Sequence, residues 1–247
     1  MFDSIRRLIK SLLYPLYERR LVRSLDFSKT PHHVGVILDG NRRWAKSNPT
    51  SHDPHGHKAG AGKIIEFLGW CDEAEVKVVT LWLLSTDNFK RSQEEIDELA
   101  ATGRWNIKAV GAMDLLPRWL EEKLSALKPI RNDGVEVNVA ISYGGRREIV
   151  DAVKSYMSQE DKAGRSLADA ASQLTTEDIS KFLYTAGQPD PELLIRTSGE
   201  QRLGGFLLWQ SAASEYYFCE AYWPDFRRVD FLRALRSYSV RQRRFGS

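Results

Sequence analysis

Segments with the patterns of strands and helices alternate along this chain of 247 residues. Apolar, β-branched runs predict the strands, and apolar residues at spacings of three and four predict the helices. This order favours a mostly parallel sheet with helices on both faces, whose functional sites lie at the carboxyl ends of the strands. The predicted strands are residues 34–38, 76–84, 105–112, 135–142, 193–197 and 215–220, and the predicted helices are residues 57–74, 92–101, 114–126, 145–158, 175–184 and 228–241.

The composition fits an α/β fold around a six-stranded sheet. The chain is 42% hydrophobic and 28% charged, which is enough for one large domain or two small ones, and no change in composition marks a boundary. We therefore expect a single domain over residues 31–247, in which the polar stretch 158–175 is a surface connection.

Charge and cysteine content exclude several classes of protein. A net charge of +3 is too small to indicate nucleic acid as a partner, so any anion must be bound by local clusters of arginine. Cys71 and Cys219 have no Cys-x-x-Cys spacing and the chain has no secretory signal, which predicts a reduced, cytoplasmic protein. No apolar run is long enough to span a membrane.

Residues 1–30 have the pattern of a basic amphipathic helix. Pro15 and the lack of a small-residue cleavage site argue against a signal peptide. Two interpretations remain open: the helix packs on the domain's own surface, which is the commoner use of such a pattern, or it lies peripherally on an anionic membrane. The apolar residues are Phe2, Ile5, Leu8, Ile9, Leu12, Leu13, Leu16 and Tyr17, and the basic residues are Arg6, Arg7, Lys10, Arg19, Arg20 and Arg23.

The first predicted strand ends in an acid, a turn and the start of a helix. Asp39 follows the strand, and Gly40, Asn41 and Arg42 then begin the helix. The free N–H groups and positive dipole end of such a helix suit a phosphate, over which Asp39 could hold a divalent metal ion. Arg43 adds a planar fork of donors for phosphate oxygens. An ordinary Asp-Gly turn with a helix cap is the alternative interpretation.

Two more strand ends carry polar residues. Residues 85–91 (Ser-Thr-Asp-Asn-Phe-Lys-Arg) indicate a loop that contacts substrate, although a polar turn before a helix that starts at Ser92 is the alternative. Residues 143–148 (Tyr-Gly-Gly-Arg-Arg-Glu) place two glycines at a helix start. The glycines would let the backbone approach a ligand closely, but a plain turn is equally consistent with the pattern.

The strongest indication of a functional site lies after the fifth predicted strand. Arg196 and Arg202 flank a Thr-Ser-Gly turn. Arginine is favoured where phosphate is recognised by paired donors, and a diphosphate needs several such donors. We therefore favour a diphosphate site over the alternative, a pair of solvated arginines. Further along, Glu215 precedes an aromatic run, where a carboxylate is costly unless it is paired or bound to a metal.

Together these motifs resemble the cis-prenyltransferases, the undecaprenyl diphosphate synthase-like enzymes that make Z-isoprenyl diphosphates. The resemblance runs from about Pro31 to Gly246, in order and at consistent spacing. It is strongest to the short-chain Z-farnesyl diphosphate synthases, which share the Arg-Arg-Trp, Leu-Leu-Ser and Glu-Gln-Arg-Leu variants. The motifs are Asp-Gly-Asn-x-Arg-Trp, Ser-Thr-Asp-Asn, Tyr-Gly-Gly-Arg, Ile-Arg-Thr-Ser-Gly-Glu-x-Arg, Leu-Leu-Trp-Gln, Ser-Glu-Tyr-Tyr-Phe and Trp-Pro-Asp-Phe.

The resemblance implies that residues 31–247 are a catalytic domain that condenses isopentenyl diphosphate with an allylic diphosphate. It implies Mg²⁺ on Asp39, with Glu215 as a second carboxylate that reaches across a homodimer interface, and a tail, Arg244-Phe245-Gly246, that folds over the partner's site. Asp39 and Asn88 are the implied catalytic residues. The implied substrate-binding residues are Gly40, Asn41, Arg42, Arg43, Trp44, His57, Ser85, Thr86, Asp87, Phe89, Arg91, Arg196, Arg202 and Gly204, with Ser198 nearby.

One departure from the family bears on the product. The segment between Arg91 and Ala112 is shorter than usual by roughly three helical turns, and bulky Trp82, Leu83 and Leu84 precede the polar loop. In the long-chain enzymes this segment forms a wall of the product tunnel. We therefore expect a short product, such as Z-farnesyl diphosphate; a weakened or inactive enzyme is the alternative.

A second departure lies before the His-Lys-Ala-Gly helix, where the family usually has an arginine and this chain has a polar loop near Asp53. His52 or His55 is a candidate to replace that arginine, and His57 is expected to contact phosphate. A zinc site on these three histidines is the alternative, but no cysteine or further ligand joins them at a usual spacing.

Other functions remain open. A longer decaprenyl or undecaprenyl product, a lavandulyl-type head-to-middle coupling and a non-catalytic subunit would all use this fold. The presence of Asp39, Arg43, Arg196 and Arg202 favours catalysis over a non-catalytic subunit. A nucleotide-binding domain is disfavoured, because neither Gly-x-Gly-x-x-Gly nor Gly-x-x-x-x-Gly-Lys-Ser/Thr follows the first strand.

Overall fold

A computed structural model describes residues 14–51, 53, 55–84, 96–97, 99–126 and 134–241 of the chain. Six strands in this part form one sheet in the order β3-β4-β2-β1-β5-β6, and the pairs β1 and β5, β5 and β6, and β3 and β4 run parallel. The predicted six-stranded, parallel α/β fold is confirmed. The strands are β1 (His33–Ile37), β2 (Val78–Leu84), β3 (Asn106–Val110), β4 (Glu136–Ile141), β5 (Leu193–Arg196) and β6 (Glu215–Phe218).

Helices lie between the strands, as the alternating pattern predicts. Residues 14–24 are helical, and residues 96–97 and 99–101 are the described part of the helix predicted over 92–101. Within the described ranges, no helix is long and apolar enough to cross a membrane. The other elements are η1 (Phe27–Lys29), α2 (Asn41–Ser47), η2 (Pro49–Ser51), α3 (His57–Glu73), η3 (Met113–Leu115), α5 (Arg118–Ser125), α6 (Gly145–Lys162), α7 (Leu167–Gln173), α8 (Thr176–Ser180), η4 (Trp223–Asp225) and α9 (Arg228–Val240).

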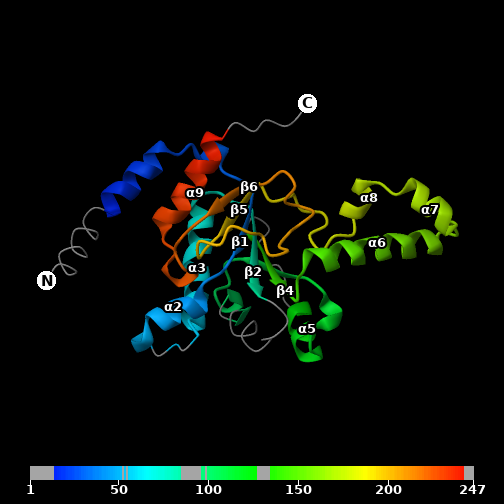
Figure 1. Ribbon diagram of the computed structural model, residues 1–247, viewed down its shortest axis with the longest axis horizontal. Coiled ribbons are helices and arrows are strands. Elements are labelled where there is room, and N and C mark those ends of the chain that lie inside the picture. Colours follow the sequence, from blue (N-terminus) through cyan, green and yellow to red (C-terminus); the bar gives the residue numbers. More distant parts are fainter. Residues whose placement is uncertain are drawn as a thin grey trace. The chain divides into compact units, whose positions relative to one another are not determined.

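The prediction of a surface connection over residues 158–175 is wrong in part, because α6 continues into this stretch and α7 lies within it. Ser166 caps α7 by accepting a hydrogen bond from the backbone N–H of Asp169 at 3.1 Å. The hydroxyl of Tyr156 on α6 donates to the carbonyl of Ala170 at 3.1 Å, so the small residues of α7 lie against α6 (Figure 1). Composition alone did not distinguish this short capped helix from a loop.

Two other predicted helices differ by four residues at one end from those observed. The helix predicted to start at residue 114 starts at Arg118, because Pro117 precedes it with a φ of −57° and an extended ψ of 138°. The helix predicted to reach residue 184 ends at Ser180. There the backbone N–H of Tyr184 donates to Glu148 at 2.9 Å instead of to a carbonyl of its own helix, so a tertiary contact overrides the local pattern.

The chain divides into two compact units. The first contains the described residues up to Val79, the segment Glu192–Gln201 and the described residues from Glu215 onward. The second contains the described residues of Thr80–Pro191 and of Arg202–Ser214. Strand β2 begins in the first unit and continues in the second.

The core of the first unit is aromatic. Phe67 on α3 is fully buried and meets three other rings nearly edge-on, with centroid distances of 5.7 Å to Trp223, 6.1 Å to Phe226 and 5.2 Å to Phe231. Edge-to-face packing of this kind adds to the stabilisation from burial. It holds α3 and α9 side by side (Figure 1).

The second unit has an aromatic contact and a separate aliphatic cluster. Phe206 is fully buried, stacks on Trp82 at a centroid distance of 5.4 Å and meets Tyr143 edge-on at 6.0 Å. Buried Ala152, Ile179 and Leu183 form the aliphatic cluster. These contacts hold the N-terminal half of α6 and the turns after α8.

Candidate active site

The candidate site begins where β1 ends. Asp39 lies two residues beyond the strand, and Gly40 is the N-cap of α2. Gly40 has a left-handed φ of 108°, and a Cβ there would lie 2.8 Å from Cδ1 of Tyr222. Only glycine fits this turn without strain. The turn brings the backbone N–H groups at the start of α2 next to Asp39.

Two arginines hold the carboxylate of Asp39. Nη2 of Arg43, one turn into α2, donates to Oδ1 at 3.0 Å, and Nη2 of Arg196 donates to Oδ2 at 2.8 Å. Arg196 is the last residue of β5 and pairs in register with Ile37 of β1. Asp39 and Arg196 are far apart in the sequence. Parallel pairing therefore brings them together at the carboxyl ends of the strands.

The arginines set the protonation state of Asp39. Burial raises the pKa of this carboxyl, but the hydrogen bonds from Arg196 and Arg43 outweigh the burial, so the pKa lies below its ordinary value of 3.8. Asp39 is therefore ionised at neutral pH. An ionised carboxylate of this kind can accept hydrogen bonds or bind a metal ion, but it has no proton to donate.

The turn after β5 completes the surroundings of Arg43. Ser198 and Gly199 have left-handed φ angles of 76° and 75°, and their backbone N–H groups donate to Ala221 at 2.8 Å and Cys219 at 2.9 Å. In this conformation Oγ of Ser198 accepts from Arg43 at 2.8 Å. Because Ser198 is not glycine, its left-handed backbone is strained, which is typical of functional turns.

The sequence did not identify several partners of the site. Oγ1 of Thr197 accepts from the backbone N–H of Asp39 at 3.0 Å, and Glu200 accepts from Arg43 at 3.3 Å. The guanidinium of Arg43 also lies 5.6 Å from the ring centroid of Tyr222. Thr197 and Glu200 belong to the motif after β5, but their distant partners could not be read from it.

Two predicted substrate-binding residues on α2 have structural contacts. Nε1 of Trp44 donates to Asp225 at 2.8 Å. Asn41 is 5% exposed, and its Oδ1 has no hydrogen-bond partner. A Cβ on Gly60 would lie 2.7 Å from this oxygen, so the glycine leaves room for the amide between α2 and α3. Arg42, in the same turn, is exposed.

The donors of this site fit a single hard cation that a substrate also ligates. Mg²⁺ usually takes one or two carboxylates and fills its other positions with phosphate oxygens and water. Asp39 supplies an ionised carboxylate beside helix N–H groups and arginines that suit diphosphate oxygens. The described residues bring together no group of three His, Cys, Asp or Glu side chains that could hold a metal ion. His52 and the side chain of His57 lie outside the description, so the zinc alternative is not tested.

Glu215 lies at the other end of the sheet from Asp39. It begins β6 and is in register with Leu193 at the start of β5, whereas Arg196 ends β5. The three steps along the strand from residue 193 to residue 196 span about 10 Å. Within one chain, Glu215 instead forms an ion pair with Arg241. A metal shared with Asp39 therefore requires a second chain, as the resemblance implied, and stays a prediction.

The structure does not test the other predicted site residues. Ser85, Thr86, Asp87, Asn88, Phe89 and Arg91 lie outside the described residues. His57 begins α3, and nothing is described of its side chain. Arg202 and Gly204 belong to the second unit, where Arg202 is exposed and Gly204 has a left-handed φ of 64°. Their predicted roles remain predictions.

The second unit contains a buried carboxylate that the sequence did not single out as a site. Glu148, in the first turn of α6, is fully buried and accepts hydrogen bonds from the hydroxyl of Tyr143 and, at 2.9 Å each, from the N–H of Tyr184 and Nε2 of Gln210. Burial raises the pKa of Glu148 above its ordinary value, although these hydrogen bonds oppose the rise. Gly145 also donates to the carbonyl of Gly205 at 2.8 Å.

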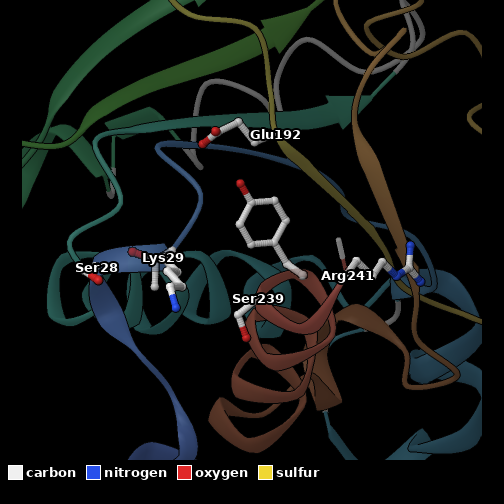
Figure 2. A pocket seen from close by; sticks show the side chains of 7 residues that line it. Ser28, Lys29, Glu192, Ser239 and Arg241 are labelled. Atoms are coloured by element: carbon white, nitrogen blue, oxygen red, sulfur yellow. The ribbon is translucent and has the colours of Figure 1, made fainter. Parts of the chain in front are cut away.

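A pocket of about 330 Å³ lies in the first unit, beside η1 and the end of α9. Figure 2 shows Lys29 and Arg241 on opposite sides of it and Glu192 above it. Glu192 accepts from the backbone N–H of His32, and Arg241 pairs with Glu215. Two of its charged groups are thus engaged within the chain, and the pocket is separate from the Asp39 site.

Comparisons with known proteins agree with this geometry. The family model described as "Putative undecaprenyl diphosphate synthase" matches residues 37–246. The (2Z,6E)-farnesyl diphosphate synthase of Thermobifida fusca is 57% identical, covering 97% of this chain and 99% of that protein. The short-chain Z-isoprenyl diphosphate synthase of Mycobacterium bovis is 48% identical, covering 96% and 97%. The structure of lavandulyl diphosphate synthase from Lavandula x intermedia in complex with dimethylallyl diphosphate aligns with a TM-score of 0.74 at 32% identity, covering 89% of this chain and all of that one.

Proposed function

The chain belongs to the undecaprenyl diphosphate synthase-like prenyltransferases, and we propose that it condenses isopentenyl diphosphate with an allylic diphosphate to give a short-chain Z-prenyl diphosphate. One observation carries the proposal. An ionised aspartate, two arginines and the N-terminus of a helix meet at the carboxyl ends of β1 and β5. This set binds anions with several charges, and diphosphates are such anions.

Asp39 and Arg43 are proposed to hold the allylic diphosphate. Its oxygens would accept from the guanidinium of Arg43 and from N–H groups of Gly40, Asn41 and Arg42. Arg43 now donates to Asp39 and Ser198, so substrate oxygens would replace acceptors that the guanidinium already uses. Mg²⁺ on Asp39, when bound, would neutralise charge on the departing diphosphate.

The reaction breaks the C–O bond of the allylic diphosphate and releases pyrophosphate. The double bond of isopentenyl diphosphate attacks the allylic cation and a C–C bond forms. One proton then passes to the released pyrophosphate, which leaves the Z double bond. The residues of the chain supply position and charge, because negative charge grows on the leaving group where Arg43 and the helix N–H groups lie. No side chain has to form a covalent bond.

The remaining residues implied by the family motifs are assigned as follows. Arg196 and Arg202 would bind the diphosphate of isopentenyl diphosphate, near Ser198 and Gly204. Asn88 would lie at the reacting carbons. The other proposed contacts with the substrates are Trp44, His57, Ser85, Thr86, Asp87, Phe89 and Arg91.

A short product is the proposed outcome. Relatives with near-complete coverage include enzymes named (2Z,6E)-farnesyl diphosphate synthase and short-chain Z-isoprenyl diphosphate synthase. The short segment between Arg91 and Ala112 and the stack of Trp82 on Phe206 also favour a small space for the chain. The likeness to lavandulyl diphosphate synthase favours head-to-middle coupling as the second candidate, and analysis of product branching separates the two.

A homodimer is proposed, with β6 at its interface. Among the described strands, β6 is the last of the sheet, so one side of its backbone pairs with none of them. Tyr216 and Phe218 stack on one face of it at 6.4 Å, and Phe218 is 38% exposed. A second copy would cover this face and bring its own Glu215 toward the Asp39 site. Light scattering of wild type and of Phe218→Glu tests this, since the variant is expected to be monomeric.

We also propose contact with a membrane surface. The product is an amphiphile that partitions into lipid, and residues 1–30 have the basic amphipathic pattern of interfacial helices.

The roles of Asp39 and of Mg²⁺ are tested together by prenyl transfer assays. Asp39→Asn should lower kcat/KM by about a hundredfold or more, because the amide neither carries charge nor binds Mg²⁺ well. Asp161→Asn, an exposed change on α6, is the matched control and should leave the rate unchanged. EDTA should abolish turnover of wild type, and excess Mg²⁺ should restore it. A near-normal rate for Asp39→Asn would contradict the assignment.

A further inference from the structure

One face of the helix formed by residues 14–24 is fixed on α9. Arg227 donates to the hydroxyl of Tyr14 and lies 4.7 Å from its ring centroid. Arg233 lies 5.0 Å from the ring centroid of Tyr17. On the same face Leu21 is only 1% exposed. Contacts of guanidinium groups with aromatic rings, together with a buried leucine, set the rotation of this helix on the first unit.

The neighbouring residue on this face is ion-paired. Glu18 pairs with Arg228, which also pairs with Glu73 of α3 at 2.7 Å. The helix is therefore tied to α9 directly, and Arg228 links it to α3 (Figure 1).

The opposite face of the helix is basic and exposed. Leu16 is 62% exposed, and Arg19, Arg20 and Arg23 are also exposed. With 3.6 residues per turn these four side chains lie within about 100° of arc. In the part of the chain that the structure describes, none of the three arginines is ion-paired. We name these four residues the arginine face.

Helix α9 also carries an exposed arginine and an exposed apolar residue. Arg236 is exposed, and Val240 is 73% exposed near the end of the helix. Both residues belong to the first unit, as the arginine face does. Exposed apolar side chains among arginines are typical of surfaces that meet lipid headgroups, because the arginines bind phosphate while the apolar groups enter the acyl boundary.

We infer that the arginine face docks on the anionic surface of a lipid bilayer, with Leu16 inserted among the headgroups. This inference names the surface for the membrane contact proposed above and rests on that part of the proposal. Three guanidinium groups that carry full charge, and that no described carboxylate neutralises, complement a sheet of lipid phosphates. The contacts with α9 fix the direction of the face, so the first unit, which carries Asp39, would be held at the membrane in one orientation.

Flotation with lipid vesicles tests the inference on the full chain. Wild type should float with vesicles of phosphatidylcholine and phosphatidylglycerol, should not float with phosphatidylcholine alone, and should lose binding at high salt. Each arginine near such a surface strengthens binding roughly fivefold, so the triple variant Arg19→Gln, Arg20→Gln and Arg23→Gln should bind about a hundredfold more weakly.

Two matched variants complete the design. Lys108→Gln, Lys154→Gln and Lys162→Gln together remove the same charge from exposed positions of the second unit and should leave binding unchanged. Arg6→Gln, Arg7→Gln and Lys10→Gln together test the segment before residue 14.

Each outcome of these experiments either supports or overturns the inference. Loss of flotation in the arginine-face variant, with an unchanged melting temperature and normal turnover of short soluble substrates, would support the inference. Equal loss in the lysine control would show a net-charge effect and overturn it. Loss only in the variant of the first ten residues would also overturn it. Absence of binding by wild type would refute membrane contact altogether, whereas failure of the prenyltransferase proposal would appear only in the turnover assay.

Discussion

Replacement of Gly40 by alanine should destabilise the first unit by an amount that the structure allows us to work out. The left-handed φ of 108° costs a residue with a Cβ about 1–2 kcal/mol. The new Cβ would also lie 2.8 Å from Cδ1 and 3.0 Å from Cβ of Tyr222, and overpacking of this kind costs about 1–3 kcal/mol. Since Tyr222 can shift in part, we expect a loss of about 2–4 kcal/mol in the free energy of unfolding.

Differential scanning calorimetry measures this effect. For a chain of this length 1 kcal/mol corresponds to about 2–4 °C, so the melting temperature of Gly40→Ala should fall by about 5–12 °C. The matched control is Gly62→Ala in α3, where a Cβ would meet nothing within 4 Å. It should stabilise the protein by about 0.5–1 kcal/mol, because alanine favours a helix interior. Equal melting temperatures for the two variants would refute the argument from backbone strain and close approach.

The turnover of the same variant adds a second readout. A shift of Gly40 moves Asp39 and the N–H groups of α2 together, so kcat/KM of Gly40→Ala should fall at a temperature where the protein is still folded. Gly62→Ala should keep wild-type turnover. Normal turnover of the Gly40 variant would show that the substrate does not need this turn.

Two further predictions concern charged groups. Arg196→Lys should lower kcat/KM by about tenfold or more, because an ammonium group cannot donate in the paired geometry that a guanidinium offers. Steady-state assays with isopentenyl diphosphate varied measure this, and an unchanged kcat/KM for that substrate would contradict it. Glu148→Gln should change the pH dependence of stability. Burial raises the folded pKa of Glu148 above 4.5, so its contribution is fully present below that pH and is lost as the pH rises through the folded pKa. In urea titrations the variant should therefore gain stability relative to wild type as the pH rises, and parallel curves would contradict the burial argument.

Local signals made the first half of the site predictable. Asp39, Gly40 and Arg43 lie at the end of a strand and the start of a helix, and each of these features has a mark in the sequence. The rule that parallel strands end at one edge then brought Arg196 to the same place. The partners Glu200 and Tyr222 could not be predicted, because their contacts depend on the register between strands and on a left-handed turn.

Glu215 shows how the same rule limits a prediction. The predicted strand 215–220 already had this residue at its start, and parallel strands start at the edge opposite to Asp39. The metal-binding role of Glu215 was inferred from the resemblance to a family. Because Glu215 and Asp39 lie far apart within one chain, this role depends on a second copy. Helix α7 was missed for a different reason, because its short, small-residue sequence depends on packing against α6.

The most direct test of the central claim is product analysis. Purified protein is incubated with Mg²⁺, labelled isopentenyl diphosphate and each allylic starter, and the dephosphorylated products are resolved by chain length, branching and double-bond geometry. The account predicts a short, linear Z product that Asp39→Asn fails to form. A long Z product would contradict the argument from the shortened segment, and no product from folded wild type would contradict the proposed catalysis itself.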